Sequence, residues 1–327
     1  MKRVLRIADM GAPCKRSGRG LSVLVKLVAL GTIAAGTVVC VGIESRRERI
    51  TKVVVKIQRA DYEGDRVALG RLYQDLTQFN DDKEFGARVR YWRGFAQWRR
   101  AMNGVNDSVP PGELAQDLKQ AISEFEEAIK KDPGFVDARA AAGSSLGILM
   151  FIYRKNPTLA PEFNDPTRAR ELILKALSYQ QEAEAADPQN PRVLWVIGQT
   201  RWNLPPERGG GQDKTFETYE KGLNAARERK GALHDPLLPS WGEAEILMNL
   251  AWSNLNRSTP DLAAAEQYAR AALALVPYWH YVRDILLPQI KAAKSKPDSK
   301  NPTSCTLPNP IELFQPPDRD EMLIGVR

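Results

Sequence analysis

Apolar residues recur at helical spacing along the chain between residues 84 and 291. Ala121, Phe125 and Ala128, for example, are separated by four and then three residues, which places them on one face of a helix. Pro133 ends that helix because proline has no backbone N–H to donate. The pattern predicts an amphipathic helix that packs small and aromatic residues against a neighbour.

This pattern of a small, a large and a small residue occurs four times, each time after another apolar helix with a small residue near its centre. A small residue at that point allows two helices to approach closely. The central residues of the four first helices are Gly94, Gly143, Gly198 and Ala251. The second helices carry Ala121/Phe125/Ala128, Ala176/Gln180/Ala183, Thr215/Tyr219/Gly222 and Ala264/Tyr268/Ala271.

The four pairs resemble tetratricopeptide repeats, a family of antiparallel helix pairs stacked in tandem. The resemblance covers roughly residues 84–291. It departs from the family at Gln180, where an aromatic residue is usual, and at Ala251, where glycine is usual. The spacing between the two helices of a pair is also longer than in the family, so we expect enlarged loops at 103–112, 155–166 and 205–211. The resemblance implies an all-α, right-handed α-solenoid of about four irregular pairs.

The flanking segments complete the expected domain organisation. Residues 44–83 are expected to form a linker and a leading helix at 61–79, followed by the repeat region at 84–293. An unpaired amphipathic helix at 278–291 is expected to cover the end of the stack. Residues 294–327 are rich in proline and are expected to be a disordered tail.

The N-terminus has the composition of a membrane-targeting segment. A basic stretch at 1–20 precedes the apolar residues 21–43, of which 27–43 carry no charge, about the shortest length that spans a bilayer. We expect a single membrane anchor with the soluble part exported to a periplasmic or other extracytoplasmic space, as in a bacterial cell envelope. Secretion after signal cleavage is the main alternative, and a lipoprotein using Cys40 is a weaker one.

The net charge of +7 does not indicate a nucleic-acid binder. Residues 1–52 contain eleven Lys and Arg against three Asp and Glu, whereas the remaining residues contain 36 against 37. A nucleic-acid interface needs basic residues on the folded domain, which is close to neutral here. The three cysteines lie at positions 14, 40 and 305, so the repeat region has neither a disulfide framework nor a cysteine metal site.

Motifs with catalytic precedent are better interpreted as structural. Gly143-Ser144-Ser145-Leu146-Gly147 matches the nucleophile elbow of serine hydrolases, but an alanine-rich helical run precedes Ser145 where that motif needs a strand. His234 and His280 have no histidine or cysteine close by in sequence, so a metal site is not expected at either. We expect no catalytic activity, no cofactor and no metal.

Two further polar stretches have simple structural interpretations. Residues 208–211, Arg-Gly-Gly-Gly, lack the lysine and serine of a nucleotide-binding loop and are expected to form a flexible turn. Glu124, Glu126 and Glu127 lie beside the apolar face of one helix and are expected to form a solvated acidic surface.

The most informative signal for function is aromatic. In the tetratricopeptide family, positions three before, one after and four after the central small residue lie on the inner, concave side of the stack. Among these positions, the candidate groove residues are Tyr91, Phe95, Trp98, Trp195, Gln199, Trp202, Met248 and Trp252. This face is either an open groove or a buried core under the enlarged loops.

The resemblance and the aromatic face together favour a protein-binding scaffold tethered at a membrane through residues 21–43. Its expected partner is another protein or a peptide segment, with no nucleic acid involved. The alternative is an exported receptor that encloses a small molecule or lipid in an aromatic-lined pocket between the helix pairs.

Overall fold

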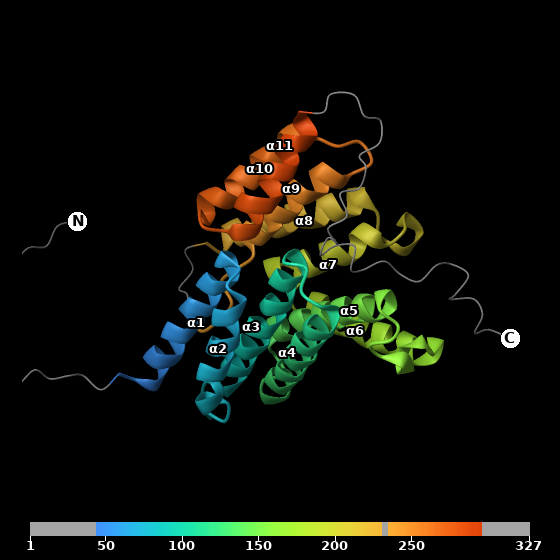
Figure 1. Ribbon diagram of the computed structural model, residues 1–327. Coiled ribbons are helices and arrows are strands. Elements are labelled where there is room, and N and C mark those ends of the chain that lie inside the picture. Colours follow the sequence, from blue (N-terminus) through green and yellow to red (C-terminus); the bar gives the residue numbers. More distant parts are fainter. Residues whose placement is uncertain (1–43, 231–234, 296–327) are drawn as a thin grey trace, which may run out of the picture. The chain divides into compact units, whose positions relative to one another are not determined.

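The computed structural model describes residues 44–230 and 235–295, and all regular structure in these residues is helical (Figure 1). The prediction of an all-α protein is therefore confirmed. The α-helices are α1 (Arg46–Glu63), α2 (Arg66–Asp75), α3 (Gly86–Asn106), α4 (Pro111–Lys131), α5 (Val136–Lys155), α6 (Pro166–Ala186), α7 (Pro191–Asn203), α8 (Gln212–Glu228), α9 (Glu243–Asn256), α10 (Leu262–Leu275) and α11 (Leu287–Lys294). Shorter helical turns are η1 (Thr77–Phe79), η2 (Pro161–Asn164), η3 (Pro206–Arg208) and the π-helical η4 (Tyr281–Leu286).

Two of the predicted segments lie outside the described residues. These are the membrane segment 21–43 with its basic leader 1–20, and the Pro-rich tail from 296 onward. None of the helices in 44–230 and 235–295 has the length and hydropathy needed to cross a bilayer.

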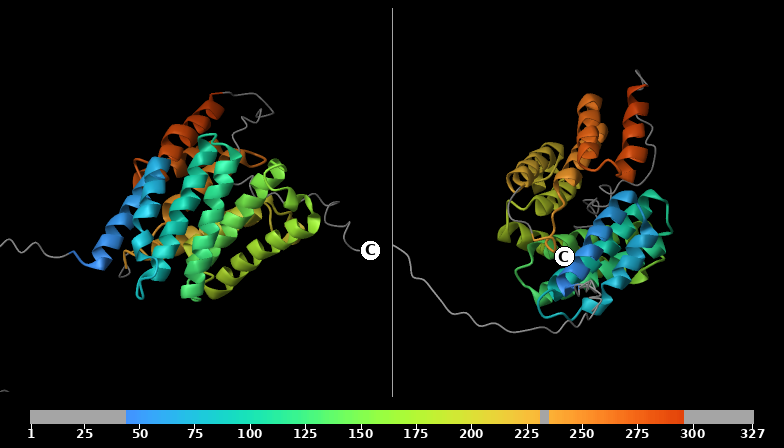
Figure 2. Two further views of the ribbon diagram at one scale, coloured as in Figure 1. Left: turned by 60° about the horizontal axis from the view of Figure 1, so that its bottom comes forward. Right: turned by 90° about the vertical axis from the view of Figure 1, so that its left-hand side faces the viewer.

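The helices pack mainly against their neighbours in sequence (Figures 1 and 2). The first and second helices of the four predicted pairs are in contact: α3 with α4, α5 with α6, α7 with α8, and α9 with α10. Successive pairs also touch, because α4 contacts α5 and α8 contacts α9.

The central glycines bring the paired helices together as expected. A Cβ atom on Gly94 would lie 2.7 Å from the ring of Phe125, and one on Gly198 would lie 2.2 Å from the ring of Tyr219. In the second pair, a Cβ on Gly143 would lie 2.9 Å from Cγ of Gln180. In these three pairs, the residue at the large position of the second helix therefore packs directly on the glycine of its partner helix.

Gln180, the departure from the aromatic pattern, keeps this packing and adds a polar contact. Its side chain is buried, and its Oε1 accepts a hydrogen bond of 3.0 Å from the hydroxyl of Thr200 on α7. The glutamine therefore links its own helix pair to the next one along the chain.

Replacing Gly198 by Ala should destabilise the fold by roughly 1–3 kcal/mol, because the added methyl group would overlap the buried Tyr219 ring. Gly70 on α2 is the matched control. A Cβ there would make only an ordinary contact of 3.6 Å with the Arg100 side chain, so Gly70→Ala should be stabilising by about 0.5–1 kcal/mol. Denaturant unfolding of both variants measures the difference, and equal effects would contradict the packing described for Gly198.

The register of the fourth pair differs from the expectation by one residue. The buried residues of α10 are Ala265, Ala269 and Ala272, whereas the predicted Ala264, Tyr268 and Ala271 are only partly buried. Three consecutive alanines at 263–265 make neighbouring helix faces equally apolar, so the sequence could not decide which face is buried. The face that the structure buries leaves the ring of Tyr268 only partly buried.

The leading helix is also divided differently from the expectation. Residues 61–63 end α1, which begins at Arg46 in the expected linker, and the predicted helix 61–79 is interrupted before α2. The break is at Gly64, whose φ of 73° is left-handed and caps α1. Ser45 and Glu48 form a capping box at the start of α1, a signal that was present in the sequence.

Candidate functional site

The predicted aromatic face is assembled, but most of it is buried. Tyr91, Phe95 and Trp98 on α3 and Trp195 on α7 are at most 2% exposed. Gln199, Met248 and Trp252 are buried as well, and Trp202 alone among the eight candidates is partly exposed. The face was expected to be either an open groove or a buried core. On α3 and the first half of α7 it is a buried core.

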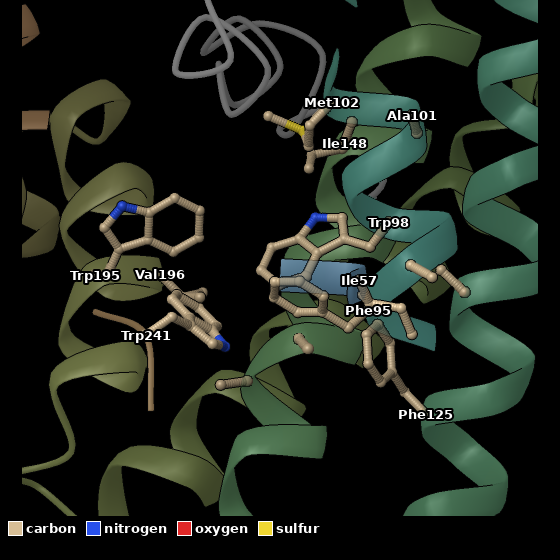
Figure 3. Close-up of a cluster of buried hydrophobic side chains, with 14 of the residues drawn as sticks. Ile57, Phe95, Trp98, Ala101, Met102, Phe125, Ile148, Trp195, Val196 and Trp241 are labelled. Carbon is tan, nitrogen blue, oxygen red and sulfur yellow. The ribbon is translucent and has the colours of Figure 1, made fainter. Parts of the chain in front are cut away.

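The connection between α8 and α9 closes this part of the face. Trp241, from that connection, lies 5.8 Å from Phe95, 5.9 Å from Trp98 and 5.5 Å from Trp195 between ring centroids (Figure 3). Its indole N–H donates to the Tyr91 hydroxyl at 3.0 Å. The closing residue thus belongs to a different loop from the three that were expected to be enlarged.

A second contact holds the same connection on α3. The indole N–H of Trp92 donates to the backbone carbonyl of Leu237 at 2.8 Å, and Leu237 itself is fully buried. Arg192 on α7 donates to the carbonyl of Trp241 at 3.1 Å. We call residues 235–242 the closing segment.

On the other half of the face, on α7 and α9, Gln199, Met248 and Trp252 are buried, and Trp202 is the candidate that remains partly accessible. The ring of Trp202 lies edge to face with Trp252 at 5.2 Å and contacts Phe216 of α8 at 6.5 Å. Leu255, three residues after Trp252, is also partly exposed. The reachable part of the predicted groove is therefore centred on Trp202.

Buried charges connect α1 to α3 next to this face. Arg99 donates to the carboxylate of Asp61 at 2.7 Å, and the amide of Asn103 donates to the same carboxylate at 3.2 Å. Both members of the ion pair are buried. Burial raises the pKa of Asp61, and the Arg99 charge opposes that shift.

A second buried carboxylate connects α1 to α9. The Tyr62 hydroxyl donates to Glu245 at 2.6 Å, and the backbone N–H of Gly242 donates to its other oxygen at 2.7 Å. Burial raises the pKa of Glu245. The ring of Tyr62 also packs edge to face on Trp279 at 5.0 Å, so the first described helix contacts the C-terminal helices. Neither network was foreseen, because each joins residues distant in sequence.

Two of the three residues singled out for possible catalysis, Ser145 and His280, lie within the described residues. Ser145 lies inside α5 and is fully buried, with helix rather than strand before it. His280 lies 2.9 Å from the carboxylate of Asp284, and Arg283 together with His280 holds the pKa of that carboxyl well below its usual range. His234 lies outside the described residues. Within the described ranges, no three His, Cys, Asp or Glu side chains are grouped to hold a metal ion.

The glycine-rich turn has no amides left for a phosphate. The N–H groups of Gly209, Gly210 and Gly211 donate to the carbonyls of Pro206, Pro205 and Arg201 respectively. A phosphate cradle requires backbone amides that point at the ligand, and here they are used inside the turn.

The expectation of a wholly solvated acidic surface was wrong for Glu124. Its carboxylate is buried and accepts hydrogen bonds from Arg93 at 2.9 Å, Arg90 at 3.0 Å and Tyr73 at 3.2 Å. Glu124 is adjacent to Phe125 and three residues after Ala121, so α4 turns it toward α3 rather than toward solvent.

Two hollows on the surface are lined by none of the eight aromatic-face candidates, although the first includes Phe216, which contacts Trp202. One, of about 380 Å³, is lined by acidic residues and by Phe216, Arg257 and Tyr268 between α8, α9 and α10. The other, of about 200 Å³, lies between α6 and α7 beside Gln180 and Arg201. Both are open to solvent, so neither resembles the enclosed aromatic pocket expected of a small-molecule receptor.

Comparison of the chain with protein-family models and with curated proteins finds no match.

Proposed function

We propose that this protein is a scaffold of the tetratricopeptide type, tethered at a membrane, that binds another protein or a peptide segment on the α7–α9 half of its inner face. The observation that carries the proposal is the partly exposed Trp202, which lies against Trp252 of the adjacent first helix. Tryptophan is enriched at the energetic centres of protein interfaces because its large ring gains much by burial.

The helix packing supports the assignment to a repeat architecture. Gly94 and Gly198 contact the aromatic residues Phe125 and Tyr219 of their partner helices, and Gly143 contacts Gln180 at the corresponding place. Repeat stacks are held together by contacts between neighbours along the chain, and their inner surfaces serve as extended binding sites. A right-handed solenoid of about four pairs is the finer form of this proposal.

Partner binding can be tested with Trp202. Full-length protein would be crosslinked in native membranes and recovered, and its partners identified by mass spectrometry. Trp202→Ala should reduce the recovery of a specific partner by about tenfold or more, since truncating such a residue often costs about 2 kcal/mol or more of binding free energy.

The matched control is Leu174→Ala, which changes a side chain that is 53% exposed on α6, outside the predicted face. This variant should recover the partner as wild type does. Equal recovery by Trp202→Ala and Leu174→Ala would refute binding at Trp202.

The membrane tether is proposed from residues 21–43, where 27–43 carry no charge. Full-length protein should stay in the membrane fraction after a carbonate wash, because an apolar span is not stripped like a peripheral contact. A cytosolic protein and a known integral protein would be blotted in the same fractions. Complete release together with a shortened mature N-terminus would show a cleaved signal instead.

A further inference from the structure

The larger surface hollow is bounded by α8, the end of α9, and α10. Its charged and aromatic lining residues are Asp213, Phe216, Glu217, Glu220, Arg257 and Tyr268. Its volume of about 380 Å³ lies within the range of roughly 300–1,000 Å³ that ligand sites occupy in proteins. Because the hollow is open to solvent, a side chain of a bound protein can enter it.

The carboxylates of the hollow come from one face of α8. Asp213, Glu217 and Glu220 are separated by four and then three residues, so they lie along one side of the helix. Lys214 pairs with Glu217 at 2.7 Å, but both side chains are more than half exposed, so this ion pair is weak. Asp213 and Glu220 form no ion pair within 44–230 and 235–295. Like charges at this spacing repel one another, and a bound cation would relieve that repulsion.

The hollow also contains a guanidinium that lacks a hydrogen-bond acceptor. Arg257 lies over the ring of Phe216, with its Cζ 5.1 Å from the ring centroid. The Arg257 side chain is partly exposed, and in the described part of the chain it forms no hydrogen bond or ion pair. Its N–H groups are therefore available to an oxygen of a ligand, such as the carbonyl that every peptide unit supplies.

The balance of charge in the hollow favours a cationic ligand. Three carboxylates line it against one guanidinium, whereas residues 53–327 as a whole are close to neutral. An anion beside Arg257 would also lie near the carboxylates of α8, which repel it. A lysine or arginine side chain would be attracted, and its aliphatic stem can pack along the rings of Phe216 and Tyr268.

We propose that this hollow receives a lysine or arginine side chain from an extended segment of the partner protein. The cation lies against the carboxylates of Asp213 and Glu220, and a backbone carbonyl of the same segment accepts a hydrogen bond from Arg257. The inference rests on the proposed function, because it specifies the chemistry of the partner that binds at Trp202.

The hollow adjoins the proposed binding residue. The ring of Phe216, which lines the hollow, contacts Trp202 with the ring centroids 6.5 Å apart. Two or three extended residues span roughly 7–10 Å. A single short segment can therefore cover Trp202 with an apolar residue and place a basic side chain in the hollow.

The first test uses the peptide acetyl-Leu-Ala-Lys-Ala-amide and the same peptide with Nε-acetyllysine. Full-length protein is labelled with 4-fluorophenylalanine, and its Phe216 signal is identified by its loss in Phe216→Leu. The lysine peptide should shift this ¹⁹F signal and bind about fivefold or more tightly than the acetylated peptide, which keeps the stem without the charge. The preference should shrink at high ionic strength. Equal binding of the two peptides would overturn the proposal.

The second test removes the charges of the hollow and keeps the shapes of the side chains. Asp213→Asn combined with Glu220→Gln should abolish the preference for the lysine peptide. The matched control is Glu228→Gln, at an exposed position near the end of the same helix and outside the hollow, which should keep the preference. A preference that survives in the double variant would show that these carboxylates do not hold the cation, which overturns the proposal.

The third test applies the same variants to the crosslinked partner from native membranes. Asp213→Asn with Glu220→Gln should lower its recovery by about fivefold or more, and Glu228→Gln should not. Loss of the partner in Trp202→Ala with full recovery in the double variant would overturn this inference and leave the proposed function in place. Loss in the double variant with full recovery in Trp202→Ala would support the hollow and refute binding at Trp202.

Discussion

Replacing Trp98 by Ala should lower the free energy of unfolding by about 3–5 kcal/mol, because the change empties the centre of the aromatic cluster. Trp98 is completely buried, and the rings of Phe95, Phe125, Trp195 and Trp241 lie around it at 5.8–6.2 Å. For a domain of this size the loss corresponds to a fall in melting temperature of roughly ten degrees. Chemical and thermal denaturation of full-length protein measure both quantities.

Trp202→Ala is the control for this experiment. It removes the same side chain from a position on the same face that is partly exposed, so its loss of stability should be clearly smaller. Equal destabilisation by the two variants, or a Trp98→Ala protein that melts like wild type, would contradict the division of the face into a closed and an accessible half.

Replacing Arg99 by Met should destabilise the protein by about 3–5 kcal/mol at neutral pH, because it leaves the Asp61 carboxylate buried without its cation. The buried Asp61 has a raised pKa even with Arg99 present. Without Arg99 that pKa should rise further, so the native state binds a proton more strongly than the unfolded state does. The stability of the variant should therefore fall as pH rises, and its deficit should be smaller near pH ~4.5 than at pH ~7.

Denaturant midpoints of wild type and variant at the two pH values check this expectation. Adding Asp61→Asn to Arg99→Met should recover part of the loss at neutral pH, since no buried charge then remains in this pair. A deficit that is independent of pH, with no recovery in the double variant, would show that Arg99 acts only by filling space.

The features that could be predicted from the sequence were local ones. The helix at 121–133 was predicted from spacings of three and four and from Pro133, and α4 buries Ala121, Phe125 and Ala128 and ends at Lys131. The glycines at 94, 143 and 198 were predicted as points where two helices approach closely. Glycine destabilises the interior of a helix, so its presence there suggests that a second helix needs the space. All of this information is contained within one or two helical turns.

The features that could not be predicted depend on contacts between distant residues. Tyr91 and Trp241 are 150 residues apart and share a hydrogen bond, and nothing near Trp241 in the sequence indicates that its ring belongs to the α3 core. For the same reason the face was left undecided between groove and core. In α10 the difficulty was different, because consecutive alanines made the periodicity consistent with more than one buried face.

Trp98 and Trp195 are core residues while Trp202 is reachable from solvent, and this division can be measured directly. Full-length protein labelled with 5-fluorotryptophan gives one ¹⁹F signal for each of its seven tryptophans, all within the described residues. A soluble paramagnetic agent should broaden the Trp202 signal most and leave those of Trp98 and Trp195 sharp. Broadening of Trp98 and Trp195 to the same extent as Trp202 would contradict the division and restore an open groove along the whole inner face.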